Sequence, residues 1–470
     1  MTRVTPPGNP PLAPTEPPAE IGRLPYAVIL KTWWPLAASW MLMAVELPLV
    51  SAVVARLPLP QVSLAAWGGV IFPVALIIES PIIMLLAAST ALSRDRQSFL
   101  LVRRFMLWTA ITLTALHALV AFTPLYDLVV GGLIGPPPEV IEPARLGLKL
   151  MTPWTLSIAY RRFHQGVLIR FGHSDAVGVG TGIRLAADGL VLAGGLVYGQ
   201  APGILVAGLA VTLGVMSEAV YAGWRARPVV RDEVMLAQAQ RQPLSLSSFL
   251  SFYFPLAMTS LLTLLIQPMG SAALSRMPQA LESLAVWPVV SGLVFMSRSL
   301  GVAYNEVVVA LLDRPRSYRA LRRFTIGLGV ATSLALLLVA ATPLSRLWFE
   351  VLSGLPAPLA ALGSEALLFA LPMPGLVVLH SWFQGTLVNR RATRGVTESV
   401  ALALAASAAV LAYGVASQPM AGLLIAWLAF DLGALVQMLW LWWRSRGSMR
   451  AIRLEEEAPA AHVPYDPVGA

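Results

Sequence analysis

Residues 33–37 (WWPLA) return as residues 253–257 (YFPLA), 220 positions later in a chain of 470 residues. The same offset relates Pro48, Ser51, Ala52, Arg56 and Pro58 to Pro268, Ser271, Ala272, Arg276 and Pro278. One residue is then lost, and an offset of 219 relates residues 103–105, 123–125 and 165–166 to 322–324, 342–344 and 384–385. A register kept from residue 33 to residue 166 indicates an internal duplication.

The duplicated unit has the composition of a membrane protein. Hydrophobic residues make up 57% of the chain and charged residues 12%, against about a quarter charged in soluble domains. The chain has no cysteine, which excludes disulfides, thiolate metal sites and a cysteine nucleophile. The net charge of +9 comes from arginines clustered between apolar runs, which sets membrane topology and does not indicate nucleic-acid binding. Lysine occurs only at Lys31 and Lys149, which favours a GC-rich bacterial genome.

Twelve segments are long and apolar enough to cross a bilayer, which takes about 20 residues. They are 27–54, 63–92, 104–125, 145–171, 175–199, 202–224, 247–274, 280–312, 320–343, 362–389, 393–416 and 419–443. Six spans per repeat make the two halves parallel. The sequence therefore predicts an all-α polytopic membrane protein with twelve transmembrane helices in two parallel, pseudo-symmetric six-helix lobes.

The domain boundaries follow from these spans. We expect a disordered N-terminal tail (1–26), an N-lobe (27–224), a cytoplasmic linker (225–246), a C-lobe (247–443) and a disordered C-terminal tail (444–470). Arginines gather in alternate loops, around residues 94–104, 225–241, 314–323, 390–394 and 444–453. By the positive-inside rule these loops and both termini are cytoplasmic, in the inner cell membrane.

Ionisable side chains inside the spans are the candidate functional residues, because each costs at least about 2.5–3.5 kcal/mol at the bilayer centre. We expect substrate binding by Arg161, Arg162, His164, Arg184, Arg298 and Asn305. We expect ion coupling or gating by Glu46, Glu79, Asp188 and Glu306. Repeat register pairs Glu46, Glu79 and Asp188 with Ile266, Ser299 and Ser407, so the charges belong to one half and predict an asymmetric central site.

Glu46 has the clearest functional interpretation, since no basic residue lies within a helical turn and Pro48 frees a backbone carbonyl beside it. The other charges also have structural interpretations. Glu79 and Glu306 would pair with arginines, and Arg184 and Asp188, one turn apart, would neutralise each other. Arg161 and Arg162 would extend toward the cytoplasmic interface. His164, like His380, would pack between helices.

Other chemistries find little support in the sequence. Metalloprotease, glycosidase, serine hydrolase and nucleotide-binding motifs are absent, so we expect neither an enzyme nor a bound metal or cofactor. The glycine-dense stretch 178–182 lies in a span and predicts close helix packing.

Two motifs carry a resemblance to a known superfamily. An aromatic-Pro-hydrophobic segment opens each half at 33–36 and 252–256, and an aromatic-x-Gly-x-Leu-type turn precedes a basic residue at 163–170 and 383–390. Both resemble the multidrug/oligosaccharidyl-lipid/polysaccharide flippase superfamily, whose members include the MATE-like transporters.

Within that superfamily the chain resembles the progressive ankylosis protein family. The likeness lies in residues 93–96, in 164–168 following Pro153, in 252–257, and in an acidic residue close to Glu46. Members of this family are associated with cellular export of citrate, nucleotide triphosphates and pyrophosphate. The resemblance therefore implies export of an organic anion.

These observations together predict a secondary transporter that works by alternating access. Its partners would be a small anionic substrate, a coupling proton or sodium ion, and membrane lipid, with no nucleic acid. Two alternatives remain open from the sequence: an ion-coupled multidrug efflux pump that uses Glu46 and Glu79, and a lipid-linked oligosaccharide flippase.

Overall fold

The computed structural model describes residues 24–239, 242–390, 392 and 394–457, and these are helical without a strand. The first half contains α1 (Tyr26–Val54), α2 (Pro60–Leu64), η1 (Ala65–Ile71), α3 (Phe72–Ile83), α4 (Leu85–Leu92), α5 (Arg96–Phe122), η2 (Asp127–Ile134), α6 (Pro138–Leu150), α7 (Thr152–Arg170), α8 (Asp175–Tyr198), α9 (Gly203–Val229) and η3 (Val230–Val234), where η marks a π-helix. The second half contains α10 (Leu246–Leu264), α11 (Ile266–Leu274), α12 (Ala280–Leu311), α13 (Ser317–Ala341), α14 (Leu344–Arg346), η4 (Leu347–Leu352), α15 (Ala357–Phe369), α16 (Pro372–Asn389), α17 (Arg394–Ser417) and α18 (Gly422–Glu457).

The predicted all-helical polytopic fold is confirmed. Within the described residues, eleven helical stretches have the length and apolar composition of a membrane span, and each matches a predicted span. The remaining prediction, 145–171, corresponds to the end of α6 and to α7. Helix α7 carries Arg161, Arg162 and His164, so its composition is too polar for that criterion. A span this polar must face protein or a cavity and not lipid.

The predicted C-terminal tail is partly wrong, because α18 continues to Glu457, past residue 444 where we expected disorder to begin. Ser445 and Ile452 of this extension are buried, and Ile452 shares a core cluster with Leu441 and with residues of α12, α13 and α16. The predicted linker 225–246 is also helical at its start, through Val229 and then through η3. Residues 1–23 of the predicted N-terminal tail and 458–470 lie outside the described residues.

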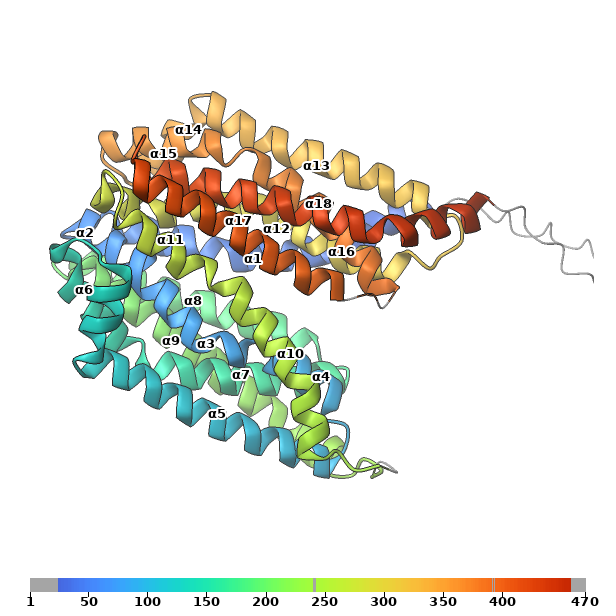
Figure 1. The fold of residues 1–470 in the computed structure, drawn as a ribbon. Coiled ribbons are helices and arrows are strands. Elements are labelled where there is room, and N and C mark those ends of the chain that lie inside the picture. The colour runs from blue at the N-terminus through green and yellow to red at the C-terminus, as the bar shows by residue number, and fades with distance from the viewer. Residues whose placement is uncertain (1–23, 240–241, 391, 393, 458–470) are drawn as a thin grey trace, which may run out of the picture.

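The helices form two bundles, which we call the N-bundle (residues 60–234) and the C-bundle (residues 280–457) (Figure 1). The first helix of each half packs on the opposite bundle: α1 lies along α12, and α10 lies along α3. In α1, Trp33 stacks edge-on against Phe324, and its Nε1 donates a hydrogen bond to the Leu300 carbonyl at 3.0 Å. The duplicated aromatic-Pro motif therefore anchors each first helix in the other half.

The repeat-equivalent contact lies in α10. Tyr253, the counterpart of Trp33, stacks edge-on against Phe105, the counterpart of Phe324, with ring centroids 4.9 Å apart. Its hydroxyl donates a hydrogen bond to the Pro81 carbonyl in α3. The exchange of first helices is thus built twice, with matching aromatic contacts.

The two halves meet closely where η1 packs on α12. A Cβ atom on Gly68 would lie 2.3 Å from Cβ of Pro288, the residue that matches Gly68 in the repeat. A Cβ on Gly69 would lie 2.7 Å from a Leu284 methyl group. Because Gly68 touches its own repeat equivalent, the pseudo-symmetry axis passes through this contact.

Two repeat-equivalent arginines join the halves at one end of the molecule, and we call them the arginine latch. Arg56, which follows α1, donates from Nη2 to the carbonyl of Val351 in η4 at 2.5 Å. Arg276, which follows α11, donates to the carbonyls of Gly132, Leu133 and Ile134 at 2.7–3.2 Å. Each arginine thus binds a π-helix of the opposite half, η4 or η2, which holds the two halves together at this end.

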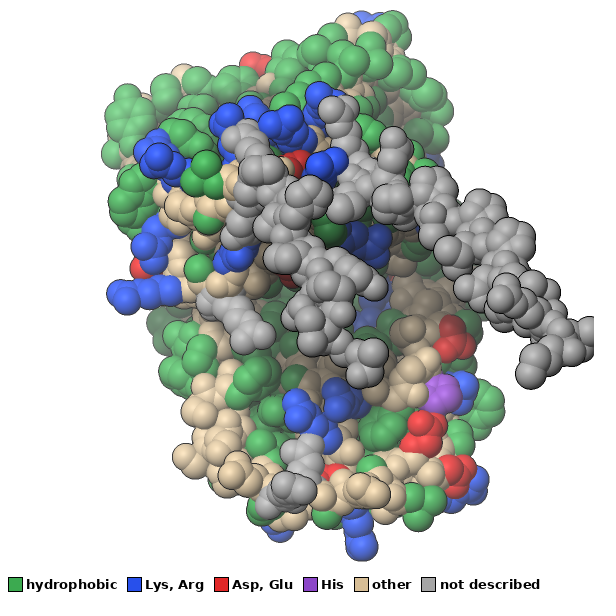
Figure 2. All heavy atoms as spheres, turned by 90° about the vertical axis from the view of Figure 1, so that its right-hand side faces the viewer, with side chains coloured by type: hydrophobic (Ala, Val, Ile, Leu, Met, Phe, Trp, Pro, Cys, Tyr) green, Lys and Arg blue, Asp and Glu red, His purple; other side chains and the backbone are tan. Residues whose placement is uncertain are grey.

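The opposite end is rich in basic side chains, and we call it the arginine-rich end. It includes the basic residues Arg103, Arg104, Arg225, Arg227, Arg322, Arg323, Arg444 and Arg446. The bundles converge at the latch and diverge toward this end (Figure 1). Figure 2 looks onto the arginine-rich end and shows Lys and Arg side chains around a recess between the bundles.

The expectation that the glycines of 178–182 serve helix packing holds only for Gly180. A Cβ on Gly180 would lie 3.3 Å from the Tyr221 ring of α9. A Cβ on Gly178 or Gly182 would meet nothing within 4 Å among the described residues. These two glycines lie on the outer side of α8.

Replacing Gly68 with alanine should destabilise the contact between the bundles. The new Cβ would overlap the Pro288 ring, and overpacking of this kind typically costs about 1–3 kcal/mol. Thermal unfolding of the purified protein in detergent measures the effect. Gly178→Ala is the matched control, because its Cβ enters open space, and it should unfold at the wild-type temperature or above. Equal unfolding temperatures for both variants would contradict the close contact.

Candidate functional site

A cavity of about 360 Å³ lies between the two bundles. Its walls come from α1, η1, α3, α7, α8 and α9 of the first half and from α10, α11 and α12 of the second. Six of the ten predicted site residues line it: Glu46, Glu79, Arg161, Arg162, Arg184 and Arg298. The structure thus brings together charges that are up to 252 positions apart in the sequence.

Four of the charges near this cavity form a buried network centred on Glu218. Arg161 Nη1 contacts Glu218 Oε2, and Gln165 Nε2 donates to Glu218 Oε1 at 2.9 Å. Arg184 contacts Glu46 with one nitrogen and lies 3.7 Å from Glu218 Oε2 with the other. Glu46 on α1 is therefore paired across helices, contrary to the expectation of an isolated carboxylate.

The pairings also decide two structural alternatives left open by the sequence. Arg184 turns to Glu46 and Glu218, and it makes no ion pair with Asp188, its neighbour one turn away. The Arg161 side chain is 6% exposed and held by Glu218 (1% exposed), so it does not extend toward the interface. An arginine that makes an ion pair with a carboxylate contributes shape and polarity to the cavity wall but little net charge.

Two other arginines remain without a carboxylate. Arg162 on α7 and Arg298 on α12 both line the cavity, and neither makes an ion pair with any described residue. Arg298 contacts an aromatic face, with its guanidinium carbon 5.2 Å from the Phe295 ring centroid. The Nε atoms of all four cavity arginines are buried and lack a hydrogen-bond partner within the described part of the chain, so the absence of a carboxylate is what distinguishes Arg162 and Arg298. One unpaired cation therefore comes from each half.

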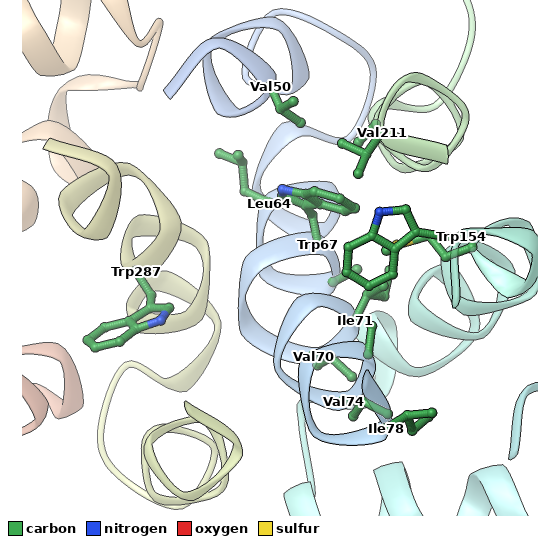
Figure 3. Close-up of a cluster of buried hydrophobic side chains, with 14 of the residues drawn as sticks. Val50, Leu64, Trp67, Val70, Ile71, Val74, Ile78, Trp154, Val211 and Trp287 are labelled. Atoms are coloured by element: carbon green, nitrogen blue, oxygen red, sulfur yellow. The ribbon is translucent and has the colours of Figure 1, made fainter. Parts of the chain in front are cut away.

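Uncharged donors in the cavity wall are also unsatisfied. The indole Nε1 atoms of Trp67 and Trp154 and the Ser291 hydroxyl are buried and have no partner among the described residues. Figure 3 shows the Trp67 and Trp154 side chains close together, with Trp287 on a separate helix, α12, apart from them. Buried donors without partners are rare in proteins and call for a ligand or water. The cavity is therefore suited to a group rich in hydrogen-bond acceptors.

Glu79 lines the cavity and makes no ion pair with a described residue, although its side chain is hydrogen-bonded to Thr155. Its side chain is 1% exposed, and Oε1 has no hydrogen-bond partner within the described residues. No arginine nitrogen lies within 4 Å of it in this part of the chain, so the predicted ion pair is not formed. The free charges facing the cavity are thus two arginines and one glutamate.

The other four predicted site residues lie away from this cavity. Asp188 is buried between α8 and α9, against Gly214. Its repeat equivalent Ser407 lies against Gly433 in the same way, and its hydroxyl donates to the Ala429 carbonyl at 3.0 Å. Asp188 therefore replaces a packing serine and is adjacent to the site without lining it.

His164, Asn305 and Glu306 are outside the cavity lining. His164 lines a separate groove near the arginine-rich end. Asn305 donates from Nδ2 to the Ser381 carbonyl at 3.4 Å, which joins α12 to α16. Glu306 lies on the exposed side of α12 and, among the described residues, has no ion-pair partner.

The sequence-based site missed Glu218 and the uncharged residues of the cavity wall. Glu218 is the only acidic residue of α9, and the cost of a charge in a span is the signal that points to it. Gln267 and Ser291 carry no such signal, because single neutral polar residues are common in membrane helices. The wall tryptophans also look like ordinary core residues in the sequence.

No protein-family model and no curated protein matches the chain. Solved structures match its fold. An inward-facing multidrug-resistance MATE family transporter of the MOP superfamily is 13% identical, with 88% of this chain and 96% of that chain covered and a TM-score of 0.68. The lipid II flippase MurJ, in an inward closed conformation, is 14% identical, with 90% of each chain covered and a TM-score of 0.71.

The chain is also similar to a MOP superfamily transporter from Pyrococcus furiosus. The reverse polarity of that protein's binding pocket is described as suggesting a different function. The transporter is 14% identical, with 90% of this chain and 97% of that chain covered and a TM-score of 0.62. These similarities show that the chain has the fold of MATE transporters.

Removing Glu218 should strongly destabilise the protein. Glu218→Ala leaves Arg161 as an uncompensated buried charge, and breaking a buried ion pair from one side costs about 3–5 kcal/mol. Denaturant unfolding in detergent micelles measures the loss. The double variant Arg161→Met with Glu218→Leu should recover most of it, because no lone charge remains.

Glu142→Ala is the surface control for this experiment. The Glu142 side chain is 74% exposed and lies 3.7 Å from Arg145, so its removal should change stability by less than about 1 kcal/mol. A Glu218→Ala variant as stable as the surface control would show that the buried network is not formed.

Proposed function

We propose that this chain is a secondary transporter that carries an organic anion through the cavity between its bundles by alternating access. The observation that supports it most directly is the pair of unpaired arginines, Arg162 and Arg298, one in each half and both facing the same cavity. An anion held between them would bring the halves together around the substrate. The transporter fold of the similar structures is consistent with this role.

The charge balance favours an anion over a cation. Arg161 and Arg184 are neutralised by Glu218 and Glu46, so the charges free to meet a substrate are two arginines against Glu79. The unsatisfied neutral groups in the wall are donors from Trp67, Trp154 and Ser291. Carboxylate and phosphate groups accept hydrogen bonds from such donors and form strong charge-assisted bonds with guanidinium groups.

The resemblance to the progressive ankylosis family supports the same substrate class, since its members are associated with the export of citrate, nucleotide triphosphates and pyrophosphate. The Pyrococcus furiosus transporter supports it as well, as a protein of this fold described by a binding pocket of reverse polarity.

The closed latch and the divergent arginine-rich end describe an inward-facing state. By the positive-inside rule, the arginine-rich end faces the cytoplasm of the inner membrane, with both termini on that side. An anion would then enter from the cytoplasm and leave after the latch opens. Glu79, unpaired in the cavity, is our candidate for the coupling proton or sodium ion, and Glu46 would gate by gripping Arg184.

A second candidate is a lipid-linked flippase, favoured by the similarity to MurJ. Such a substrate carries a phosphate that suits the same arginines, but it must also reach the cavity from the lipid. A transport assay with water-soluble substrates separates the two functions.

Uptake of labelled citrate and ATP into proteoliposomes tests the proposal. We expect saturable uptake. Arg162→Ala and Arg298→Ala should each reduce it about 10- to 100-fold, because each removes a charge-assisted hydrogen bond to the substrate. Arg170→Ala is the matched control, because Arg170 ends the same helix but is exposed and outside the cavity, and it should leave uptake unchanged.

The other outcomes assign other functions. Movement of a cationic dye driven by a proton or sodium gradient, without anion uptake, would indicate drug efflux and make Glu79 the residue to follow. Translocation of a lipid-linked sugar without uptake of either soluble anion would indicate the flippase. Anion uptake unaffected by both cavity arginines would disprove the site.

Loss of the arginine latch should favour the outward-open state. Arg56→Ala combined with Arg276→Ala removes the contacts that hold η2 and η4 to the opposite half, so spin labels at positions 128 and 352 should move apart. Because the chain has no cysteine, introduced cysteines carry the labels without background. Arg346→Ala, an exposed arginine at the same end, is the control, and equal distance distributions in both variants would rule out the latch.

A further inference from the structure

A second hollow lies at the arginine-rich end of the N-bundle, outside the central cavity. This groove has a volume of about 520 Å³ and runs between α5 and the α9–η3 segment, with α7 as its floor. Its apolar lining includes Phe99, Met106, Leu107, Val230 and Met235. We call it the N-bundle groove.

The polar residues that line the groove are mainly basic. Arg103, Arg227 and Arg231 line it, and no acidic residue does. Arg231 is occupied by Asp232, with hydrogen bonds of 2.6 and 2.9 Å. Arg103 and Arg227 are exposed and make no ion pair with a described residue, so both are available to a ligand.

His164 on α7 is a polar residue on the floor of the N-bundle groove. It is 8% exposed, and its Nδ1 lies 2.8 Å from the Tyr160 carbonyl. No described residue is a hydrogen-bond partner of its Nε2. A histidine that sequence analysis assigned to the substrate therefore belongs to this groove.

The repeat-equivalent position in the C-bundle has an aromatic ring that the N-bundle groove lacks. Repeat register matches Gly223 with Trp442 and Arg227 with Arg446. In the C-bundle, the Arg446 guanidinium lies 3.6 Å from the centroid of the Trp442 ring, which engages it by a cation–π contact. In the N-bundle a glycine replaces that tryptophan, and Arg227 has no ring to stack on.

We propose that the N-bundle groove binds an anionic glycerophospholipid of the inner leaflet. Arg103 and Arg227 would hold the headgroup phosphate, and an acyl chain would lie along Met106, Leu107 and Val230. Basic pockets between membrane helices on the cytoplasmic side bind anionic headgroups in this way. Free phosphate would need only the two guanidinium groups. The apolar residues of the groove lining favour a lipid, because they can contact an acyl chain.

Native mass spectrometry of the purified protein with added phosphatidylglycerol or phosphatidylcholine of the same chains tests the proposal. Phosphatidylglycerol should bind more tightly. Arg103→Ala with Arg227→Ala should weaken its binding about 30-fold, at about 1 kcal/mol for each arginine. The matched control is Arg322→Ala with Arg446→Ala, the repeat-equivalent pair in the C-bundle, which should retain wild-type binding.

A third variant tests the acyl-chain contact without changing charge. Val230→Trp fills the groove and should weaken binding of phosphatidylglycerol while leaving the arginines in place. If both double arginine variants weakened phosphatidylglycerol binding equally, the effect would come from general surface charge, and the proposal would be overturned. Inorganic phosphate that competes as well as the lipid would overturn the lipid as occupant.

Discussion

A charge inside a membrane protein is stable only if something compensates it, and the Glu218 network meets this requirement for two arginines at once. Glu218 holds Arg161 on α7 and approaches Arg184 on α8, and Arg184 reaches Glu46 on α1. Because α1 packs on the C-bundle, this network also joins the N-bundle to a helix that belongs structurally to the other side. The internal compensation of charge therefore also links the N-bundle to α1, the helix that packs on the C-bundle.

The same requirement gives meaning to the charges that the network leaves out. Burying Arg162 and Arg298 in a membrane protein costs free energy, and no carboxylate forms an ion pair with either to offset it. The proposal of an anionic substrate rests on these two unpaired cations. The halves contribute unequally, since the network lies in the first half whereas the second supplies Arg298, Gln267 and Ser291. A duplicated scaffold whose first half carries most of the cavity charges therefore has an asymmetric cavity beside its pseudo-symmetry axis.

Sequence patterns predicted the helices well and their partners poorly. Hydrophobic length and the 220-residue repeat located the spans, because both depend on local composition. The repeat also predicted that the aromatic-Pro segments are equivalent, but not that each anchors in the opposite bundle. Glu46 looked isolated because its partner Arg184 is 138 positions away. The helical extension of α18 was missed because it is stabilised by contacts with the rest of the C-bundle, such as those of Ile452. These contacts are not visible in the local sequence.

The exchange of α1 and α10 has a consequence for how such a chain arose. Two six-helix units that each pack their first helix on the other have the arrangement of a domain-swapped dimer, here within a single chain. Neither unit alone would cover the surface of α3 or α12 where the borrowed helix lies. Mutational drift would therefore be restrained at the aromatic anchors, Trp33 and Tyr253, and free at the charges of the cavity. The duplicated chain kept aromatic residues at its anchors while its two halves acquired different electrostatics.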